Sequence, residues 1–420
     1  MPYSTPEQLR FPPLAGYTVR ADFEGGALSS DFGALLLRGI DRQIGLTERL
    51  AAAMQDKRHQ SYIDHTLRDL LAQRIYQIAS GYADGNDAKS LRHAPLFKLR
   101  VERSPLEPAQ DLASAPTFSR LEHSVDRKDL YRLTHALVDH FIASYPEPPA
   151  AIVLDLDHSD DQTHGQQAFA FYNHHYRSYC YLPLCIFEGT SHALVTACLR
   201  PGTRPPGREN AMILVRLLAV LRRHWPRTHL LVRGDSHFAT PEVLEVLAHR
   251  RGIDFVFGLA GNAVLLRQAA PIMQEARWFY QQRTAQAQAH GERSPASSRV
   301  YEELYCARGN CENDIKAVKC DLHSDRTSAT TFLANAMRLL LSCAAYVLHH
   351  ALRTHTLAHT PLATAQPSTL ILTLFKVATQ VKQYKDRILL HLPTSCPVKA
   401  LLARVTALLS AVPIPVLNTS

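Results

Sequence analysis

The chain has 420 residues and a formal net charge of +8, from 46 lysines and arginines against 38 aspartates and glutamates. Its hydrophobic fraction of 46% excludes a disordered chain, and its length allows one large core or about two to three domains. The mildly basic balance favours a polyanionic partner without identifying one.

The cysteines and the apolar segments exclude several classes of protein. Eight cysteines are scattered without a CxxC pair, which gives no zinc spacing and predicts reduced thiols in a cytosolic protein. Residues 1–17 lack the charged and apolar regions of a signal peptide. The longest apolar stretch, near 332–352, is interrupted by Asn335, Arg338 and two histidines, so we expect a buried helix and no membrane partner.

Residues 1–148 are predicted to form a mostly helical N-terminal domain. Its first 27 residues are rich in proline and glycine and are expected to be irregular. Apolar residues then recur at helical spacing over 32–50, with a break at Gly39 or Gly45. Further helices are predicted over 62–78 and 127–145, with a loop-rich stretch between them.

Basic side chains in this domain suggest contact with a DNA backbone, because phosphate contacts need only such side chains and helix starts. A helical bundle with ordinary surface charge explains the same composition equally well. The basic residues in question are Arg68, Arg74, Arg92, His93, Lys98, Arg100, Arg103 and Arg120.

A proline-rich boundary near 146–149 precedes a segment that alternates between strands and helices. Residues 149–261 are predicted to hold strands at 151–157, 181–188, 193–199, 229–233 and 254–261, with helices at 209–224 and 241–250. The first three strands are expected to form an antiparallel meander. The order of these elements predicts a mixed α/β sheet flanked by helices.

The remaining chain is expected to be helical with a small α+β end. Residues 262–298 are predicted to be a helix that fades into a flexible Gln- and Ala-rich loop. Two helices are then predicted, over 299–326 and 330–353. In the C-terminal region, 357–420, segment 369–377 is expected to be a strand or a buried helix, and its β-branched residues favour the strand. As a strand it could pair with 387–392 in a hairpin, and a helix is predicted at 397–411.

One face of the predicted helix 299–326 is unusually polar. Tyr305, Arg308, Glu312, Ile315 and Lys319 follow one another at steps of three or four residues and therefore share a face. A phenol, a guanidinium, a carboxylate and an ammonium on one face suit a site for a polyanion and a metal. A solvated face with ion pairs at helical spacing is the alternative.

Acidic residues end two of the predicted strands. Asp155 and Asp157 lie at alternate positions and point to the same face, and Asp235 follows another apolar strand. With Glu312 they would supply the hard oxygen ligands that Mg²⁺ prefers. Two such ions, roughly 3.5–4 Å apart, promote phosphoryl transfer. Each acid alone is explained as a cap or turn residue, but their order along the chain favours a metal site.

These residues resemble a known family. Tyr305, Arg308, Glu312 and Lys319 match the Y-x2-R-x3-E-x6-K signature of DDE transposases encoded by bacterial insertion sequences. LDLDHSDD is similar to the segment of that family's first Asp and selects Asp157 over Asp155, and LLVRGDSHF is similar to the second and selects Asp235. Other stretches resemble the insertion-sequence-thirteen-eighty group, namely THGQQ, CYLPL, LRPG, ARGNCEN and DRTSATTFLANAMRLLL.

The resemblance implies a ribonuclease-H-like catalytic core over 149–261 and 299–356, with a shortened insertion at 262–298. It implies two Mg²⁺ or Mn²⁺ ions on Asp157, Asp235 and Glu312, which would be the catalytic residues. It also implies that DNA is contacted by Tyr305, Arg308, Lys316 and Lys319. Other candidates are expected only to surround the ligands, namely Asp155, Asp160, Asp161, His164 and His237, with His158 as a neighbour and not a base.

The implied activity is DNA transposition. The enzyme would act as an endonuclease and strand transferase that cuts the ends of its own mobile genetic element and joins the 3′ ends to target DNA. The implied partners are double-stranded DNA, as terminal inverted repeats and as target, and at least a second copy of the chain in the DNA complex. The implied location is the bacterial cytoplasm, in association with the nucleoid.

The segment before the glutamate helix departs from the family. Members usually carry a β-rich insertion there, ending in a sheet strand, whereas only 76 residues separate Asp235 from Glu312 here. We interpret this as an internal deletion near 283–300 that would displace Glu312 and impair the enzyme. A catalytically inactive relative that binds DNA ends is therefore the alternative function. A metal-dependent nuclease unrelated to transposition is a third.

Overall fold

The computed structural model describes residues 8–14, 17–259, 261, 263–289 and 305–411. The predicted N-terminal helices are confirmed, with bounds α1 (Ala34–Ile44), α2 (Leu46–Ala53), α3 (Leu67–Ala79) and α7 (Arg127–Ala143). Between α3 and α7 lie three further helices, α4 (Ala88–Leu91), α5 (Pro95–Arg100) and α6 (Ala115–Ser124). Gly45, in the left-handed region at φ +64°, separates α1 from α2, whereas Gly39 lies inside α1. Asp126 caps α7 by accepting hydrogen bonds from the backbone N–H groups of Lys128 and Asp129.

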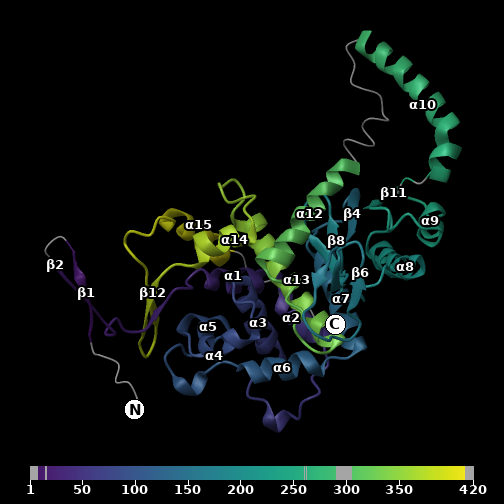
Figure 1. Ribbon diagram of the computed structural model, residues 1–420. Coiled ribbons are helices and arrows are strands. Elements are labelled where there is room, and N and C mark those ends of the chain that lie inside the picture. Colours follow the sequence, from purple (N-terminus) through teal and green to yellow (C-terminus); the bar gives the residue numbers. More distant parts are fainter. Residues whose placement is uncertain (1–7, 15–16, 260, 262, 290–304, 412–420) are drawn as a thin grey trace.

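Two expectations for the N-terminal part are wrong. The segment expected to be irregular contains strands β1 (Gln8–Leu14) and β2 (Tyr17–Asp22), which form an antiparallel hairpin that projects from the rest of the chain (Figure 1). The stretch expected to be loop-rich contains α4, α5 and α6. Their buried side chains, such as Leu96, Phe97 and Phe118, pack into the core, so tertiary contacts stabilise helices that the local sequence signals only weakly.

A five-stranded mixed sheet lies beside these helices, in the order β11-β10-β4-β8-β9. β4 is parallel to β10, and β10 is parallel to β11, whereas β4, β8 and β9 form the predicted antiparallel meander. The mixed α/β class is therefore confirmed. The strand bounds are β4 (Ala151–His158), β8 (Leu184–Glu188), β9 (Leu194–Cys198), β10 (His229–Gly234) and β11 (Ile253–Phe257). A smaller sheet joins β5 (Asp161–Gln162), β7 (Ser178–Tyr181) and β6 (Phe171–Asn173).

The two faces of the large sheet bury different sets of residues. Ile152, Leu154 and Leu156 of β4 pack in one core with α8 (Gly207–His224) and α9 (Pro241–Ala248). The alternate residues Asp155 and Asp157 lie on the other face, beneath α12 (Gly309–Lys316), because successive side chains of a strand point to opposite faces.

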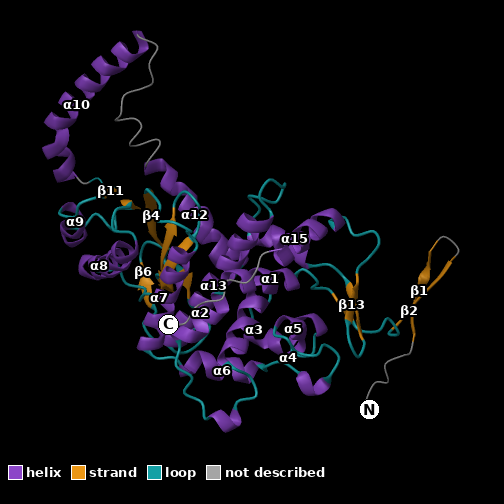
Figure 2. Cartoon of the chain, turned by 180° about the vertical axis from the view of Figure 1, so that it is seen from behind, coloured by secondary structure: helices purple, strands orange, loops and turns teal. Residues whose placement is uncertain are grey.

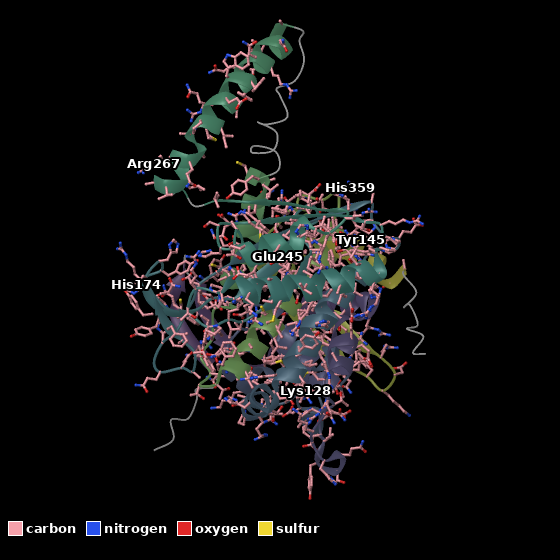
Figure 3. The ribbon with its side chains drawn as sticks, turned by 90° about the vertical axis from the view of Figure 1, so that its right-hand side faces the viewer. Lys128, Tyr145, His174, Glu245, Arg267 and His359 are labelled. Atoms are coloured by element: carbon pink, nitrogen blue, oxygen red, sulfur yellow. The ribbon has the colours of Figure 1, made fainter. Side chains whose placement is uncertain are left out.

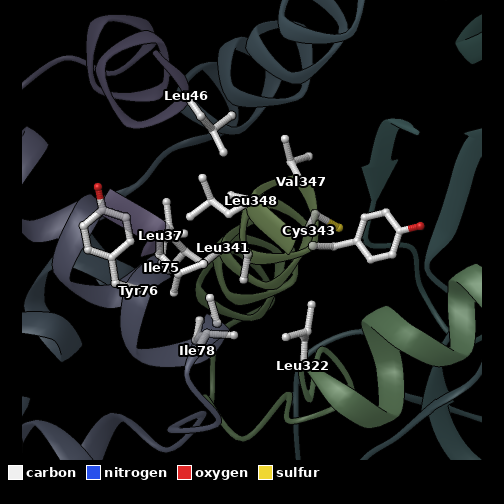
Figure 4. Packing of buried hydrophobic residues seen from close by; sticks show 14 of the residues in the cluster. Leu37, Leu46, Ile75, Tyr76, Ile78, Leu322, Leu341, Cys343, Val347 and Leu348 are labelled. Carbon is white, nitrogen blue, oxygen red and sulfur yellow. The ribbon is translucent and has the colours of Figure 1, made fainter. Parts of the chain in front are cut away.

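The helix α13 (Phe332–Thr356) is the centre of the larger core (Figure 4). Leu341, Cys343 and Leu348 are buried between the N-terminal helices and the sheet. This is the only described helix whose length and composition would allow it to cross a membrane, and 83% of its apolar window is buried inside the protein. The sequence-based expectation of a buried core helix is confirmed.

The C-terminal region differs from its prediction at one element. At 369–377 the favoured strand is wrong and the alternative of a buried helix is confirmed, because the segment forms α14 (Pro367–Leu370) and a π-helical turn over Ile371–Phe375. Leu370, Ile371, Leu374 and Phe375 are buried at helical spacing, and this burial overrides the strand preference of the β-branched residues. The hairpin instead joins β12 (Thr379–Gln383) and β13 (Ile388–His391), and β12 also pairs with β3 (Leu28–Ser29). The predicted final helix is present as α15 (Lys399–Ala411).

The helix α10 (Ala263–Ala289) extends away from the sheet and both cores (Figures 1 and 2). Figure 3 shows Arg267 near its attached end, clear of the other elements. Large apolar side chains on α10 are exposed, among them Leu266, Ile272 and Trp278. The predicted helix in this interval is confirmed over 263–289, and the expected loop at 290–298 lies outside the described residues.

Candidate functional site

Asp157 and Asp235 come together at one edge of the sheet. The parallel register pairs Arg233 of β10 with Asp155 of β4, so Asp235 follows at the level of Asp157. Burial raises the pKa of Asp157 to about 6; the Arg308 guanidinium acts against this shift, and the Asp235 carboxylate adds to it. Neighbouring buried carboxylates of this kind are stabilised by a cation between them.

His237 fixes the orientation of Asp235. Its backbone N–H donates to Asp235 Oδ1 at 3.0 Å, and its ring Nδ1 lies 2.7 Å from Asp235 Oδ2. Although burial acts to raise it, the pKa of Asp235 is lowered by these hydrogen bonds and by the charge of His237. The carboxylate therefore stays ionised at neutral pH.

Asp155 forms an ion pair with Arg233 and does not contribute to the candidate site. Its two carboxylate oxygens accept from Nε and Nη2 of Arg233 at 2.6 and 2.7 Å, and both side chains are buried. A Cβ atom at Gly189 would clash with both partners, so glycine is needed at this close approach. This pair ties β4 to β10 and leaves Asp157 as the acid of the strand that faces α12.

The glutamate helix is shorter and less regular than predicted. Cys306–Arg308 is a 3-10 turn, α12 covers Gly309–Lys316, and a π-helical turn over Ala317–Asp321 ends the element five residues before the predicted 326. Cys311 and Ile315 are buried and fasten α12 to the core. The predicted start at 299–304 lies outside the described residues.

Arg308 contacts both Asp157 and Glu312. Its Nη1 lies 2.8 Å from Asp157 Oδ2, and its Nη2 lies 3.7 Å from Glu312 Oε1. Glu312 is therefore on the same side of the sheet as the two aspartates. Its side chain is 66% exposed, whereas that of Asp157 is 14% exposed, so the glutamate lies at the rim of the site.

Two other residues of the polar face, Tyr305 and Lys319, also reach this edge of the sheet. Lys319 Nζ lies 2.7 Å from Oδ1 of Asp160, in the segment that follows β4. A Cβ atom at Gly258 would clash with the Tyr305 hydroxyl, which places that phenol at the end of β11. Lys316 is exposed on α12.

The surrounding candidates differ in their environments. His158 stacks on Phe238 with ring centroids 5.0 Å apart, and burial lowers its pKa to about 3, so its ring is neutral. Asp161 is fully buried, its oxygens accept no hydrogen bond from the described residues, and burial raises its pKa. His164 is exposed. The ring of His158 and the carboxylate of Asp161 make no hydrogen bond within the described chain, whereas the backbone N–H of His158 donates to the Asp157 carboxylate.

The sequence did not reveal a polar cluster behind α12. Asp314, two residues after Glu312, bonds to His192 of the β8–β9 turn and to Tyr346 of α13. These residues are 122 and 32 positions away along the chain, and no motif links them. Only the fold brings them together.

Three carboxylates of hard-ligand type fit a divalent cation chemically. As the side chains lie, no group of three or more His, Cys, Asp or Glu within the described residues is arranged to hold an ion. The Arg308 guanidinium lies between Asp157 and Glu312, which is why their carboxylates do not form such a group.

A separate apolar cavity of about 710 Å³ lies between α7, α8 and β9, and no candidate ligand lines it.

Comparison with known proteins gives a family and a solved structure. The family described as Transposase DDE domain group 1 matches residues 11–294 and 292–414. A search of curated proteins finds no match. The cryo-EM structure of the piggyBac transposase synaptic complex with hairpin DNA is similar with a TM-score of 0.28 and 15% identity, over 56% of this chain and 52% of that one. The match thus spans about half of that protein, and no conclusion rests on it.

Proposed function

The chain belongs to the transposase DDE domain group 1 family, and from this premise we propose that it cuts the ends of its own insertion sequence and transfers the 3′ ends to target DNA. The observation that carries the proposal is the edge of the sheet where Asp157 and Asp235 lie together beneath α12, with Arg308 joining Asp157 to Glu312. Membership of the insertion-sequence-thirteen-eighty group, with its Y-R-E-K signature, is part of the proposal.

The strand order supports a ribonuclease-H-like core. β4 is central. On one side lies β8, antiparallel to β4, and then β9, antiparallel to β8; on the other side lie β10 and then β11, both parallel to β4. Side chains that follow parallel strands meet at one edge of such a sheet. This topology explains how acids 78 residues apart in the sequence, Asp157 and Asp235, reach one site.

Asp157, Asp235 and Glu312 would hold two Mg²⁺ or Mn²⁺ ions. Bound ions would supply activation of the attacking oxygen and stabilisation of the leaving oxygen in phosphoryl transfer. The chain contributes two preorganised acids: Asp157 is buried against Arg308, and His237 orients Asp235 through two hydrogen bonds. Glu312 lies at the rim of the site, and its side chain would rotate inward from solvent to complete the three carboxylate ligands.

The cations of the polar face would bind the DNA backbone. Arg308 and Lys319 each pair with a carboxylate, Asp157 and Asp160 respectively, and a phosphate would replace that carboxylate as the partner. Such an exchange keeps each cation hydrogen-bonded to an anion, so it avoids the cost of an unpaired charge. Tyr305 at the end of β11 and the exposed Lys316 would extend the same backbone contact.

A shortened insertion remains part of the proposal. The two family matches meet at 292–294, inside the interval where the sequence predicts a deletion near 283–300. The alternative function, DNA-end binding without cleavage, is favoured by the 66% exposure of Glu312.

Because two DNA ends must be paired, we propose that at least two copies act together on bacterial chromosomal DNA in the cytoplasm.

Cleavage of terminal-repeat DNA tests the proposal. Purified full-length protein is incubated with labelled end DNA in the presence and absence of Mn²⁺, together with the Asp235→Ala variant. Cleavage that requires Mn²⁺ and is lost in the variant supports the transposase. Binding of end DNA without cleavage supports the inactive relative instead. Cutting that ignores the end sequence contradicts both and indicates an unrelated nuclease.

A further inference from the structure

Three polar side chains join α12 to the sheet and to α13 on the side away from Asp157. Asp314 Oδ2 lies 2.8 Å from His192 Nδ1, and the Tyr346 hydroxyl lies 3.2 Å from Asp314 Oδ1. The same hydroxyl donates to the backbone oxygen of His192 at 2.8 Å. The Asp314 side chain is 13% exposed and Tyr346 is buried, whereas the His192 side chain is 37% exposed. The Tyr346 bonds are therefore shielded from water, and the imidazole bond is partly open to it.

The turn that carries His192 is itself bonded to the strand of Asp157. The buried Glu188 carboxylate accepts from the Val153 N–H of β4 at 3.0 Å. It also accepts from the backbone N–H groups of Thr190 and Ser191 at 3.1 and 2.6 Å. A continuous set of hydrogen bonds thus runs from β4 through the turn to α12, the helix of Glu312.

His192 adopts a backbone conformation that side chains rarely take. Its φ is +62°, in the left-handed region where glycine is favoured. Strain of this kind persists where other contacts hold the residue in place. At His192 those contacts are the imidazole bond to Asp314 and the Tyr346 bond to its carbonyl oxygen.

Two buried side chains and the Arg308–Asp157 ion pair also hold α12. The helix has eight residues, of which Cys311 and Ile315 are buried. We infer that His192, Asp314 and Tyr346 are positioning residues that set the distance of Glu312 from Asp157 and Asp235. The inference rests on the proposed function, because the position of Glu312 matters through the ions it would hold. Displacement of a catalytic group by about 1 Å costs on the order of 100-fold in rate.

The variant His192→Gly tests this role because the substitution has two opposite effects on the turn. Glycine relieves the positive φ but removes the bond to Asp314. His359→Gly is the matched control, because His359 also has φ +62° and is exposed after α13. Two readouts on the full chain apply: hydrogen exchange of the α12 amides by mass spectrometry, and Mn²⁺ affinity by titration calorimetry.

We expect His192→Gly to speed exchange in α12 and to weaken Mn²⁺ binding, each by about tenfold, as the loss of one charge-assisted hydrogen bond would do. His359→Gly should leave both unchanged. Tyr346→Phe keeps the ring that packs on Phe187 and loses the hydroxyl, so it should act in the same direction with a smaller effect.

Three results would overturn the inference in different ways. Unchanged exchange of α12 in His192→Gly would show that the cluster does not hold the helix. Faster exchange with wild-type Mn²⁺ affinity would show that the helix position does not govern ion binding. Failure of the wild type to bind Mn²⁺ at a site removed by Asp235→Ala would contradict the proposed function, and the positioning role would fall with it.

Discussion

Asp157 is the residue whose environment is most informative. Burial raises its pKa to about 6, against the effect of Arg308, so the acid keeps its proton to a higher pH than an exposed aspartate. The strand pattern of the sequence places Asp157 correctly at the end of β4. The pKa, in contrast, depends on α12 folding over it and could not be derived from the strand alone.

The raised pKa makes divalent-ion binding dependent on pH. Below about pH 6 the protonated form of Asp157 predominates, and a proton must leave before an ion binds. Mn²⁺ affinity should therefore be level at pH 7–8 and fall by about tenfold per unit below pH 6. Calorimetry between pH 5 and pH 8 measures this, with Asp157→Asn as the control that binds weakly throughout. An affinity that stays constant down to pH 5 would rule out Asp157 as a ligand.

Arg308 is expected to compete with the ions for Asp157. Arg308→Ala should raise Mn²⁺ affinity in the absence of DNA, because the carboxylate loses its 2.8 Å partner, and should lower DNA affinity because a phosphate contact is lost. Calorimetry and fluorescence anisotropy measure the two effects. Asp160→Asn serves for comparison: it frees Lys319 and should strengthen DNA binding without altering Mn²⁺ affinity. A fall in both affinities in Arg308→Ala would contradict the competition.

Other single residues show why a basic composition is a poor guide to DNA contact. Arg100, one of the candidates for a phosphate contact, is fully buried, lies over the Phe97 ring and donates to the Tyr76 carbonyl and the Ser80 hydroxyl. Arg74 and Lys98 are buried as well. Those three assignments to DNA are wrong, because their positive charges are used inside the N-terminal core.

Among the helices and strands, apolar periodicity correctly predicts the elements that bury one face in a core. The strands β4 and β10 and the helices α7, α8 and α13 all lie where the apolar spacing puts them. The failures at 369–377 and at the end of the glutamate helix occur where local preference competes with packing. The cluster of Asp314, His192 and Tyr346 could not be predicted, because its members meet only through the tertiary fold.

The two long helices after the sheet should differ sharply in their contribution to stability. Leu348 of α13 is fully buried, so Leu348→Ala should lower the free energy of unfolding by about 2–5 kcal/mol. Leu266 of α10 is 64% exposed, and Leu266→Ala should change the free energy of unfolding by less than about 0.5 kcal/mol. Urea denaturation followed by circular dichroism measures both. Equal losses would mean that α10 packs on the protein in solution.

At the scale of the whole molecule, the helical N-terminal part and the sheet share one core around α13. Buried residues from Leu36 to Val405 belong to it, including Phe187 and Leu194 of the sheet. The prolines near 146–149 mark a change in local structure, but they do not separate the buried cores.

The proposal for the whole molecule is that acids from β4, from the residue after β10 and from α12 act on DNA as one site. A crystal structure of the full chain with Mn²⁺ and terminal-repeat DNA, with the ions located by anomalous scattering, tests this most directly. We expect Mn²⁺ peaks coordinated by Asp157, Asp235 and Glu312, and the Arg308 guanidinium on a phosphate. Mn²⁺ bound elsewhere, with Glu312 in solvent and Arg308 still on Asp157, would contradict the proposal.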